Sequence, residues 1–335
     1  MKISKVSRVL LLITALFAVI ILIGLGTIKK LNSNQLKVLI VGDSISEGAG
    51  ASSAELVWYK YLIPYMKETY GVKLDITNVS MGGTRSYAGY VRLMELDDAE
   101  DFDLAIICYG ENDLPEELSL YYESILYTIR YKYPDCKLMT ILESSQREYT
   151  DKIKTIQSLS EHYGAYVVDT IAAFNNSGKA YEELCSDGTH PNDEGQKVYY
   201  EAVKPSITLF YSQRESKILP DVEPINAEVV NFDKFIYYPL KDFTKIDDDT
   251  YELDIDTLSG TLGIDYTTVQ GESHTLIYAD GENVFDRHII WENGFQMRFI
   301  EKAVDECEIN SKIRLVFSSK EQMENFHGLI IHNYN

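Results

Sequence analysis

The chain has 335 residues, of which 45% are hydrophobic and 25% are charged, and it contains 25 tyrosines and 12 phenylalanines. This composition is typical of a folded protein and excludes an intrinsically disordered chain, and the length leaves room for about two domains. The formal net charge is −21. Because so acidic a surface repels phosphate backbones, we expect no nucleic-acid partner.

A membrane anchor is expected at the amino terminus. Residues 9–28 carry no charge over twenty positions, which is long enough to cross a bilayer. Three basic residues precede this segment and two follow it, which favours a short cytoplasmic tail (1–8), a single-pass transmembrane signal anchor in the cell membrane, a linker (29–36) and an extracytoplasmic body. The alternative is a cleaved signal peptide and a secreted protein.

Residues 37–218 alternate between short apolar runs and longer stretches with helical spacing. The predicted strands are 37–41, 74–78, 104–108, 137–142 and 165–169, and the predicted helices between them are 55–70, 87–96, 117–133 and 148–163. This alternation predicts parallel strands with right-handed helical crossovers, and therefore an α/β fold in a three-layer α/β/α sandwich with a parallel five-stranded sheet. Ligands of such sheets bind beyond the carboxyl ends of the strands.

The pattern changes after a predicted linker at 219–226. Short runs rich in β-branched and aromatic residues lie at 235–238, 251–255, 274–279, 295–300, 313–317 and 329–332, separated by turn signals such as Asp280-Gly281 and 292–294. They predict an all-β sandwich or jelly-roll domain over 227–335. Its aromatics, including Tyr237, Tyr238 and Trp291, fit a sandwich core, and a sugar-stacking platform is the alternative.

The four cysteines, Cys108, Cys136, Cys185 and Cys307, have neither a CxxC pair nor zinc-like spacing. We therefore predict no metal site, and nothing in the sequence implies a cofactor. Cys108 lies in an apolar run and is expected to be a packed free thiol. A bridge between Cys136 and Cys185 stays open, since the expected compartment is oxidising.

Four polar blocks fall where the predicted strands end or where the last helix begins. They are residues 41–46 (VGDSIS), 78–84 (NVSMGGT), 110–113 (GEND) and 187–191 (DGTHP). Each block alone also fits a turn or a helix cap. Together they contain a serine, a histidine, an acid and amide donors, which is the set that acyl transfer needs, and their joint order favours catalysis.

In this order the blocks resemble the SGNH (GDSL-like) hydrolase family of serine esterases over about residues 37–205. The resemblance implies a flavodoxin-like α/β fold, with Ser44 as nucleophile and with Asp187 and His190 as the acid and the base. It also implies an oxyanion hole formed by the Ser44 amide, the Gly83 amide and the Asn112 side chain.

The residue chemistry agrees with these roles. His190 is the residue type that accepts a serine proton near neutral pH, and Asp187, three positions earlier, is able to fix its tautomer. Preorganised donors are needed where the tetrahedral intermediate becomes negative. Asp43, Arg85 and Glu111 lie beside these blocks in the sequence and are candidate substrate-binding residues.

The expected function is that of an extracytoplasmic serine esterase that removes O-acetyl groups from carbohydrate through an acyl-serine intermediate. Its partner would be an acylated carbohydrate or another small ester. Three alternatives stay open: a polysaccharide O-acetyltransferase supplied by a membrane acyl-donor partner, a lipase or thioesterase, and a non-catalytic glycan-binding protein.

Overall fold

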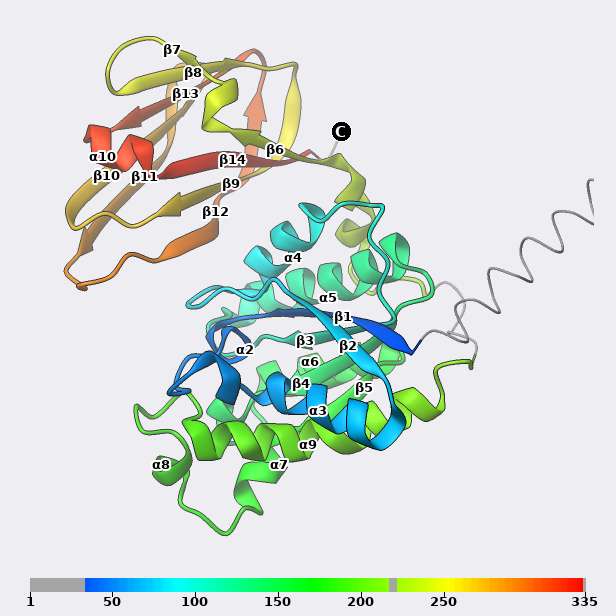
Figure 1. Ribbon diagram of the computed structural model, residues 1–335. Helices are drawn as coiled ribbons and strands as arrows, with labels where there is room; N and C mark the ends of the chain where they lie inside the picture. Colours follow the sequence, from blue (N-terminus) through cyan, green and yellow to red (C-terminus); the bar gives the residue numbers. More distant parts are fainter. Residues whose placement is uncertain (1–33, 217–221, 334–335) are drawn as a thin grey trace, which may run out of the picture.

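The computed structural model describes residues 34–216 and 222–333, which form an α/β domain followed by a β-domain (Figure 1). The predicted anchor at 9–28 lies outside these residues. Within the two described ranges, no helix is both long enough and apolar enough to cross a membrane.

The α/β domain contains the predicted five-stranded parallel sheet, in the order β2-β1-β3-β4-β5. Its strands are β1 (Gln35–Gly42), β2 (Lys73–Asn78), β3 (Leu104–Cys108), β4 (Lys137–Leu142) and β5 (Tyr166–Asp169). Every residue of β3 and β4 is buried, as expected for parallel strands that are covered on both faces. The predicted three-layer fold is confirmed.

Helices cover both faces of this sheet. One core cluster contains residues of α4 (Ser86–Met94), α5 (Pro115–Lys132) and α6 (Asp151–His162). The other contains residues of α2 (Ser44–Glu47), α3 (Trp58–Tyr70), α7 (Thr170–Asn175), α8 (Tyr181–Leu184) and α9 (Asp193–Ser212). Cys136 belongs to the first cluster and Cys185 to the second, and both are buried free thiols, so the two cysteines do not form a disulfide.

The β-domain is an antiparallel sandwich of two sheets, ordered β11-β10-β13-β8-β7 and β12-β9-β14-β6. Its elements are β6 (Phe235–Pro239), β7 (Thr244–Lys245), β8 (Thr250–Asp254), β9 (Leu258–Thr267), β10 (Gly271–Ala279), β11 (Glu282–Trp291), β12 (Arg298–Ile309), β13 (Lys312–Phe317), α10 (Lys320–Glu324) and β14 (Phe326–Asn333). Short 3-10 helices complete the chain at Ala54–Leu56, Ser144–Gln146, Ala227–Lys234 and Leu240–Asp242. The predicted sandwich is confirmed.

The Asp280-Gly281 turn joins β10 and β11 as expected. Both residues have positive φ values, 49° and 94°, which is the conformation of a two-residue hairpin turn whose twist matches that of the strands. Asp280 also accepts hydrogen bonds from the backbone amides of Asn310, Ser311 and Lys312, and these bonds tie the hairpin to the start of β13.

The two domains share a core at the junction between α4 and the β12-β9-β14-β6 sheet (Figure 1). Ile300 and Ile330 of that sheet belong to the same buried cluster as α4 and α5. The Tyr90 ring on α4 meets the Phe235 ring edge-on, with their centroids 5.9 Å apart. Gly263 of β9 lies so close to Tyr87 that an ideal Cβ at this position would overlap the Tyr87 hydroxyl.

We expect the substitution Gly263→Ala to destabilise the protein by about 1–3 kcal/mol, because the added methyl group overpacks the junction. The Tyr87 side chain cannot turn aside freely, since it is 4% exposed and its ring packs against Tyr121 at 4.9 Å between centroids. Urea unfolding monitored by circular dichroism measures the change. Gly294→Ala is the matched control, because no atom lies within 4 Å of its ideal Cβ. Equal stability of the two variants would contradict a tight junction.

Candidate active site

The four polar blocks of the sequence meet at one edge of the parallel sheet. Ser44 follows β1, Gly82 and Gly83 follow β2, and Asn112 follows β3. The strand order reverses between β1 and β3, which is the switch point where ligands of open α/β sheets bind. His190 lies in the loop before α9.

A tight turn between β1 and α2 presents the nucleophile candidate Ser44. An ideal Cβ on Gly42 would lie 2.7 Å from the Cys108 carbonyl oxygen, so this close approach of β1 to β3 requires a glycine. Asp43 caps α2 by accepting a hydrogen bond from the Ile45 amide at 3.0 Å. The result is that Ser44 begins a helix at the sheet edge, with 8% of its surface exposed.

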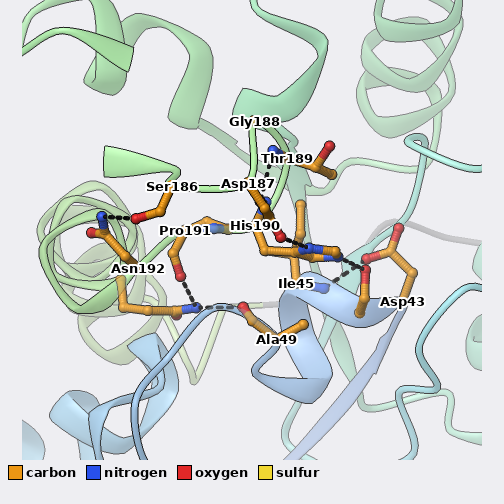
Figure 2. Close-up of polar contacts among 12 residues, drawn as sticks. Asp43, Ile45, Ala49, Ser186, Asp187, Gly188, Thr189, His190, Pro191 and Asn192 are labelled. Carbon is orange, nitrogen blue, oxygen red and sulfur yellow. Dashed lines mark hydrogen bonds and ion pairs between the residues drawn. The ribbon is translucent and has the colours of Figure 1, made fainter. Parts of the chain in front are cut away.

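The loop at 187–191, which Figure 2 shows, brings the imidazole of His190 to this serine. His190 Nε2 lies 2.9 Å from Ser44 Oγ, and His190 Nδ1 lies 2.7 Å from Asp187 Oδ2. The other Asp187 oxygen accepts hydrogen bonds from the backbone amides of Thr189 and His190, at 3.0 and 2.8 Å. The three side chains are therefore within mutual hydrogen-bonding reach, in the order that a serine relay requires.

The electrostatics of this loop keep Asp187 ionised. Partial desolvation raises the pKa of Asp187, but hydrogen bonds from the His190 ring and from the two backbone amides outweigh it and lower this pKa to about 2. The carboxylate is therefore negative throughout the pH range in which an imidazole titrates. A permanent negative charge at Nδ1 stabilises the imidazolium that forms when His190 takes a proton.

The oxyanion-hole candidates lie beside the serine. Gly83 has a φ of +71°, a left-handed conformation that favours glycine, and it is exposed. The Gly82 amide already donates to Glu47 Oε2 at 3.0 Å. Asn112 Nδ2 donates to the Thr84 carbonyl at 3.1 Å and makes a longer contact of 3.4 Å with Asp43 Oδ2.

The β-domain borders this site. An ideal Cβ on Gly83 would lie 2.8 Å from the Met297 methyl group and 3.4 Å from the Phe299 ring. The Trp291 ring contacts both the Phe299 ring and the 61% exposed Phe295 ring, each with centroids 6.1 Å apart. An aromatic cluster of the second domain thus continues from the oxyanion loop to the surface.

The other aromatics singled out in the sequence lie elsewhere. The Tyr237 hydroxyl donates to the buried Asp265 at 2.8 Å, and Tyr238 packs against the core of the sandwich. Both are therefore structural in this fold.

Of the three candidate substrate contacts, Asp43 is fully buried and has no surface to offer a ligand, so the expectation for this residue is wrong. Arg85 is half exposed and its Nε donates to the Asn112 carbonyl at 3.1 Å. Glu111 is partly exposed and accepts a hydrogen bond from Gln146 at 2.6 Å. A substrate contact stays a prediction for Arg85 and Glu111.

Two residues outside the four blocks form hydrogen bonds with backbone groups of the site. Lys152 Nζ donates to the carbonyl groups of Gly110, Glu111 and Asp113, at 2.6, 3.0 and 3.2 Å. Glu143 accepts the Glu111 amide at 2.7 Å. The sequence does contain a signal for Glu143, since it is a charged residue immediately after the wholly apolar end of a buried strand. Lys152 has no such signal, because its spacing fits the exposed face of a helix.

In the described part of the chain, no group of three or more histidine, cysteine or acidic side chains is arranged to hold a metal ion.

Comparisons with known proteins concern the family and the fold. Residues 40–198 match the model of the GDSL-like lipase/acylhydrolase family. Among solved structures, the chain resembles a two-domain esterase (CEX) active on acetylated mannans and co-crystallized with mannopentaose, with a TM-score of 0.69 and 16% identity over 89% of this chain and 92% of that one. An acetyl xylan esterase variant, Axe2 from Geobacillus stearothermophilus, matches with a TM-score of 0.44 and 19% identity over 56% of this chain and 97% of that one.

No curated protein matches the sequence. At these identities the structural likeness concerns the fold, which in the two-domain esterase extends over both domains. The family match covers all four blocks, and it lies within the domain that carries the serine, histidine and aspartate. The α/β domain of this chain therefore belongs to the SGNH/GDSL-like hydrolase family, and the chain is a carboxylic ester hydrolase.

Proposed function

We propose that this chain is an extracytoplasmic acetylesterase that removes O-acetyl groups from carbohydrate through an acyl-serine intermediate. The observation that carries the proposal is the continuous relay from Ser44 Oγ to His190 Nε2, at 2.9 Å, and from His190 Nδ1 to Asp187, at 2.7 Å. Such a relay is the machinery for splitting an ester in two steps.

In the first step Ser44 Oγ attacks the ester carbonyl while His190 Nε2 takes its proton. The oxygen of the tetrahedral intermediate becomes negative, and the amides of Ser44 and Gly83 and the side chain of Asn112 are the donors at hand. Asn112 Nδ2 makes two hydrogen bonds, and the 3.4 Å contact with Asp43 is the longer and weaker one. The Nδ2 hydrogen in this weaker bond is therefore the one that can turn to the oxyanion. His190 then protonates the leaving sugar hydroxyl, and water repeats the sequence on the acyl-serine.

Three features support a carbohydrate substrate. The two-domain esterase that shares this fold over both domains acts on acetylated mannans. The aromatic cluster of Trp291, Phe295 and Phe299 leads away from the oxyanion loop, and exposed rings provide faces on which sugars stack. The net charge of −21 favours a neutral polysaccharide over an anionic one.

The uncharged segment at 9–28 supports a location outside the cell membrane, where such polymers lie.

The test uses the purified full-length chain and measures its hydrolysis of three substrates: p-nitrophenyl acetate, p-nitrophenyl octanoate and acetylated mannan. We expect the acetyl ester to be preferred, acetate to be released from the polymer, and Ser44→Ala to be inactive. Ser212→Ala, on the exposed end of α9, is the matched control. Preference for the octanoyl ester would contradict the carbohydrate assignment. Acetate appearing on an added acceptor sugar instead of in solution would identify a transferase.

The substitution Asp187→Asn should lower kcat by about 10⁴-fold, because an amide at Nδ1 stabilises the wrong imidazole tautomer and removes the negative charge. Steady-state kinetics with p-nitrophenyl acetate measures the loss. Glu182→Gln is the control, since it neutralises an exposed carboxylate in the preceding helix, which within the described residues pairs with Arg147 at 3.7 Å. If both substitutions had the same small effect, Asp187 would not act in the relay.

The substitution Asn112→Ala should lower kcat about 100-fold to 1,000-fold, because one oxyanion donor is lost. The effect should fall on kcat and leave KM nearly unchanged, since the donor binds charge that exists only in the transition state. Asn176→Ala, at the exposed end of α7, serves as the control. A raised KM with unchanged kcat would instead make Asn112 a ground-state substrate contact.

A further inference from the structure

Two acidic side chains are buried together directly behind the catalytic edge. Asp43 and Glu143 both have 0% exposure, and they lie close enough for the charge of Glu143 to raise the pKa of Asp43. Two neighbouring carboxylates that are both buried and both charged are strongly disfavoured, so one of the two holds a proton. Neither residue touches the histidine relay, so the mechanism above gives the pair no role.

Each member of the pair fixes one of the two turns that carry the chemistry. Asp43 accepts the Ile45 amide of the nucleophile turn at 3.0 Å and contacts Asn112 Nδ2 at 3.4 Å. Glu143 accepts the Glu111 amide of the neighbouring turn at 2.7 Å. The buried pair therefore connects the turn of Ser44 to the turn of Asn112.

We propose that Glu143 is a positioning residue, and that the proton it shares with Asp43 keeps the oxyanion donor Asn112 in register with Ser44. Loss of this proton to solvent at alkaline pH leaves two adjacent anions in a buried site, and their repulsion parts the two turns. The inference rests on the proposed esterase function, because it assigns Asn112 to the oxyanion hole.

The surroundings of the pair favour a retained proton. Burial is the main cause that raises the pKa of Glu143, to about 7, and burial followed by the charge of Glu143 raises the pKa of Asp43 well above its usual range. The titratable and charged groups around Glu143, from every element packed against it, are Asp43, Cys108, Tyr109, Glu111, Asp113, Tyr122, Lys152 and Tyr199.

Among these groups only Lys152 is a cation, and its ammonium group is already bound to three carbonyl oxygens of the Asn112 turn. The Cys108 thiol is a weak donor to Glu143, at 3.3 Å. No neighbour therefore offers full compensation for a second negative charge.

The sign of the pH effect follows from the raised pKa. A group that holds its proton more tightly in the folded state stabilises that state below its ordinary pKa of 4.5, and this advantage is lost as the pH rises through about 7. The Asn112 turn should accordingly be best ordered on the acidic side of this value, and the oxyanion hole should weaken above it.

The experiment compares kcat for p-nitrophenyl acetate against pH in the full-length wild-type chain, Glu143→Gln and Glu143→Ala. We expect wild-type kcat to fall on the alkaline side and the glutamine variant to lack this fall, because its neutral amide donates to Asp43 without a titrating proton. Glu143→Ala should lose about 100-fold in kcat at every pH, since misplacement of a catalytic group by about 1 Å has that effect.

Glu123→Gln is the matched control. Glu123 is also 0% exposed and its carboxylate binds the amides of Ile225 and Asn226, remote from the catalytic edge. Its substitution should lower stability and leave the shape of the kcat profile unchanged. A glutamine variant of Glu143 with the wild-type alkaline fall, or with the loss seen for alanine, would overturn the proposal.

Infrared difference spectroscopy reports the proton without any catalysis. A protonated-carboxyl band should titrate near neutral pH in the wild type and in Ser44→Ala, and be absent in Glu143→Gln. If this band is present while no ester is hydrolysed, the proposed function fails and the shared proton stands. If ester is hydrolysed and no such band exists, the shared proton fails alone.

Discussion

The hydrogen bond between Ser44 Oγ and His190 Nε2 joins residues 146 positions apart, and the rest of the α/β domain meets the conditions for it. Residues so distant in the sequence come together only if the sheet fixes the positions of the two loops that carry them. The parallel order β2-β1-β3-β4-β5 places the serine turn at the switch point, and the Asn192 cap of α9 fixes the point where the histidine loop ends. This short hydrogen bond therefore depends on the buried strands of the sheet.

The site has a buried support on one side and a second domain on the other. Behind it, Asp43, Glu143 and Lys152 bind main-chain groups of the two catalytic turns, which leaves their side chains unavailable to substrate. In front of it, Met297 and Phe299 rest on the oxyanion loop. The relay between these supports is small, and its precision comes from groups that do not contact the ester.

Much of this arrangement could be predicted from the sequence. Strands β1 and β3 contain continuous apolar runs, three of the four polar blocks follow strands, and the fourth precedes α9. Three β-domain strands were missed for physical reasons. β7 has only two residues, β9 carries Gly263 where Tyr87 needs space, and β11 includes charged residues such as Asp286 and Arg287. Asp43 was placed at the substrate because sequence proximity to Ser44 says nothing about the direction of a side chain.

The contact between Met297 and Gly83 limits how such a protein can be assembled from parts. A sugar-binding module on a flexible tether can be exchanged for another without altering the catalytic domain. Here the second domain supplies the surface against which the oxyanion loop is packed, together with Ile300 and Ile330 of the shared core. A replacement module would have to reproduce that surface. The sequences of the two domains are therefore constrained to change together during evolution.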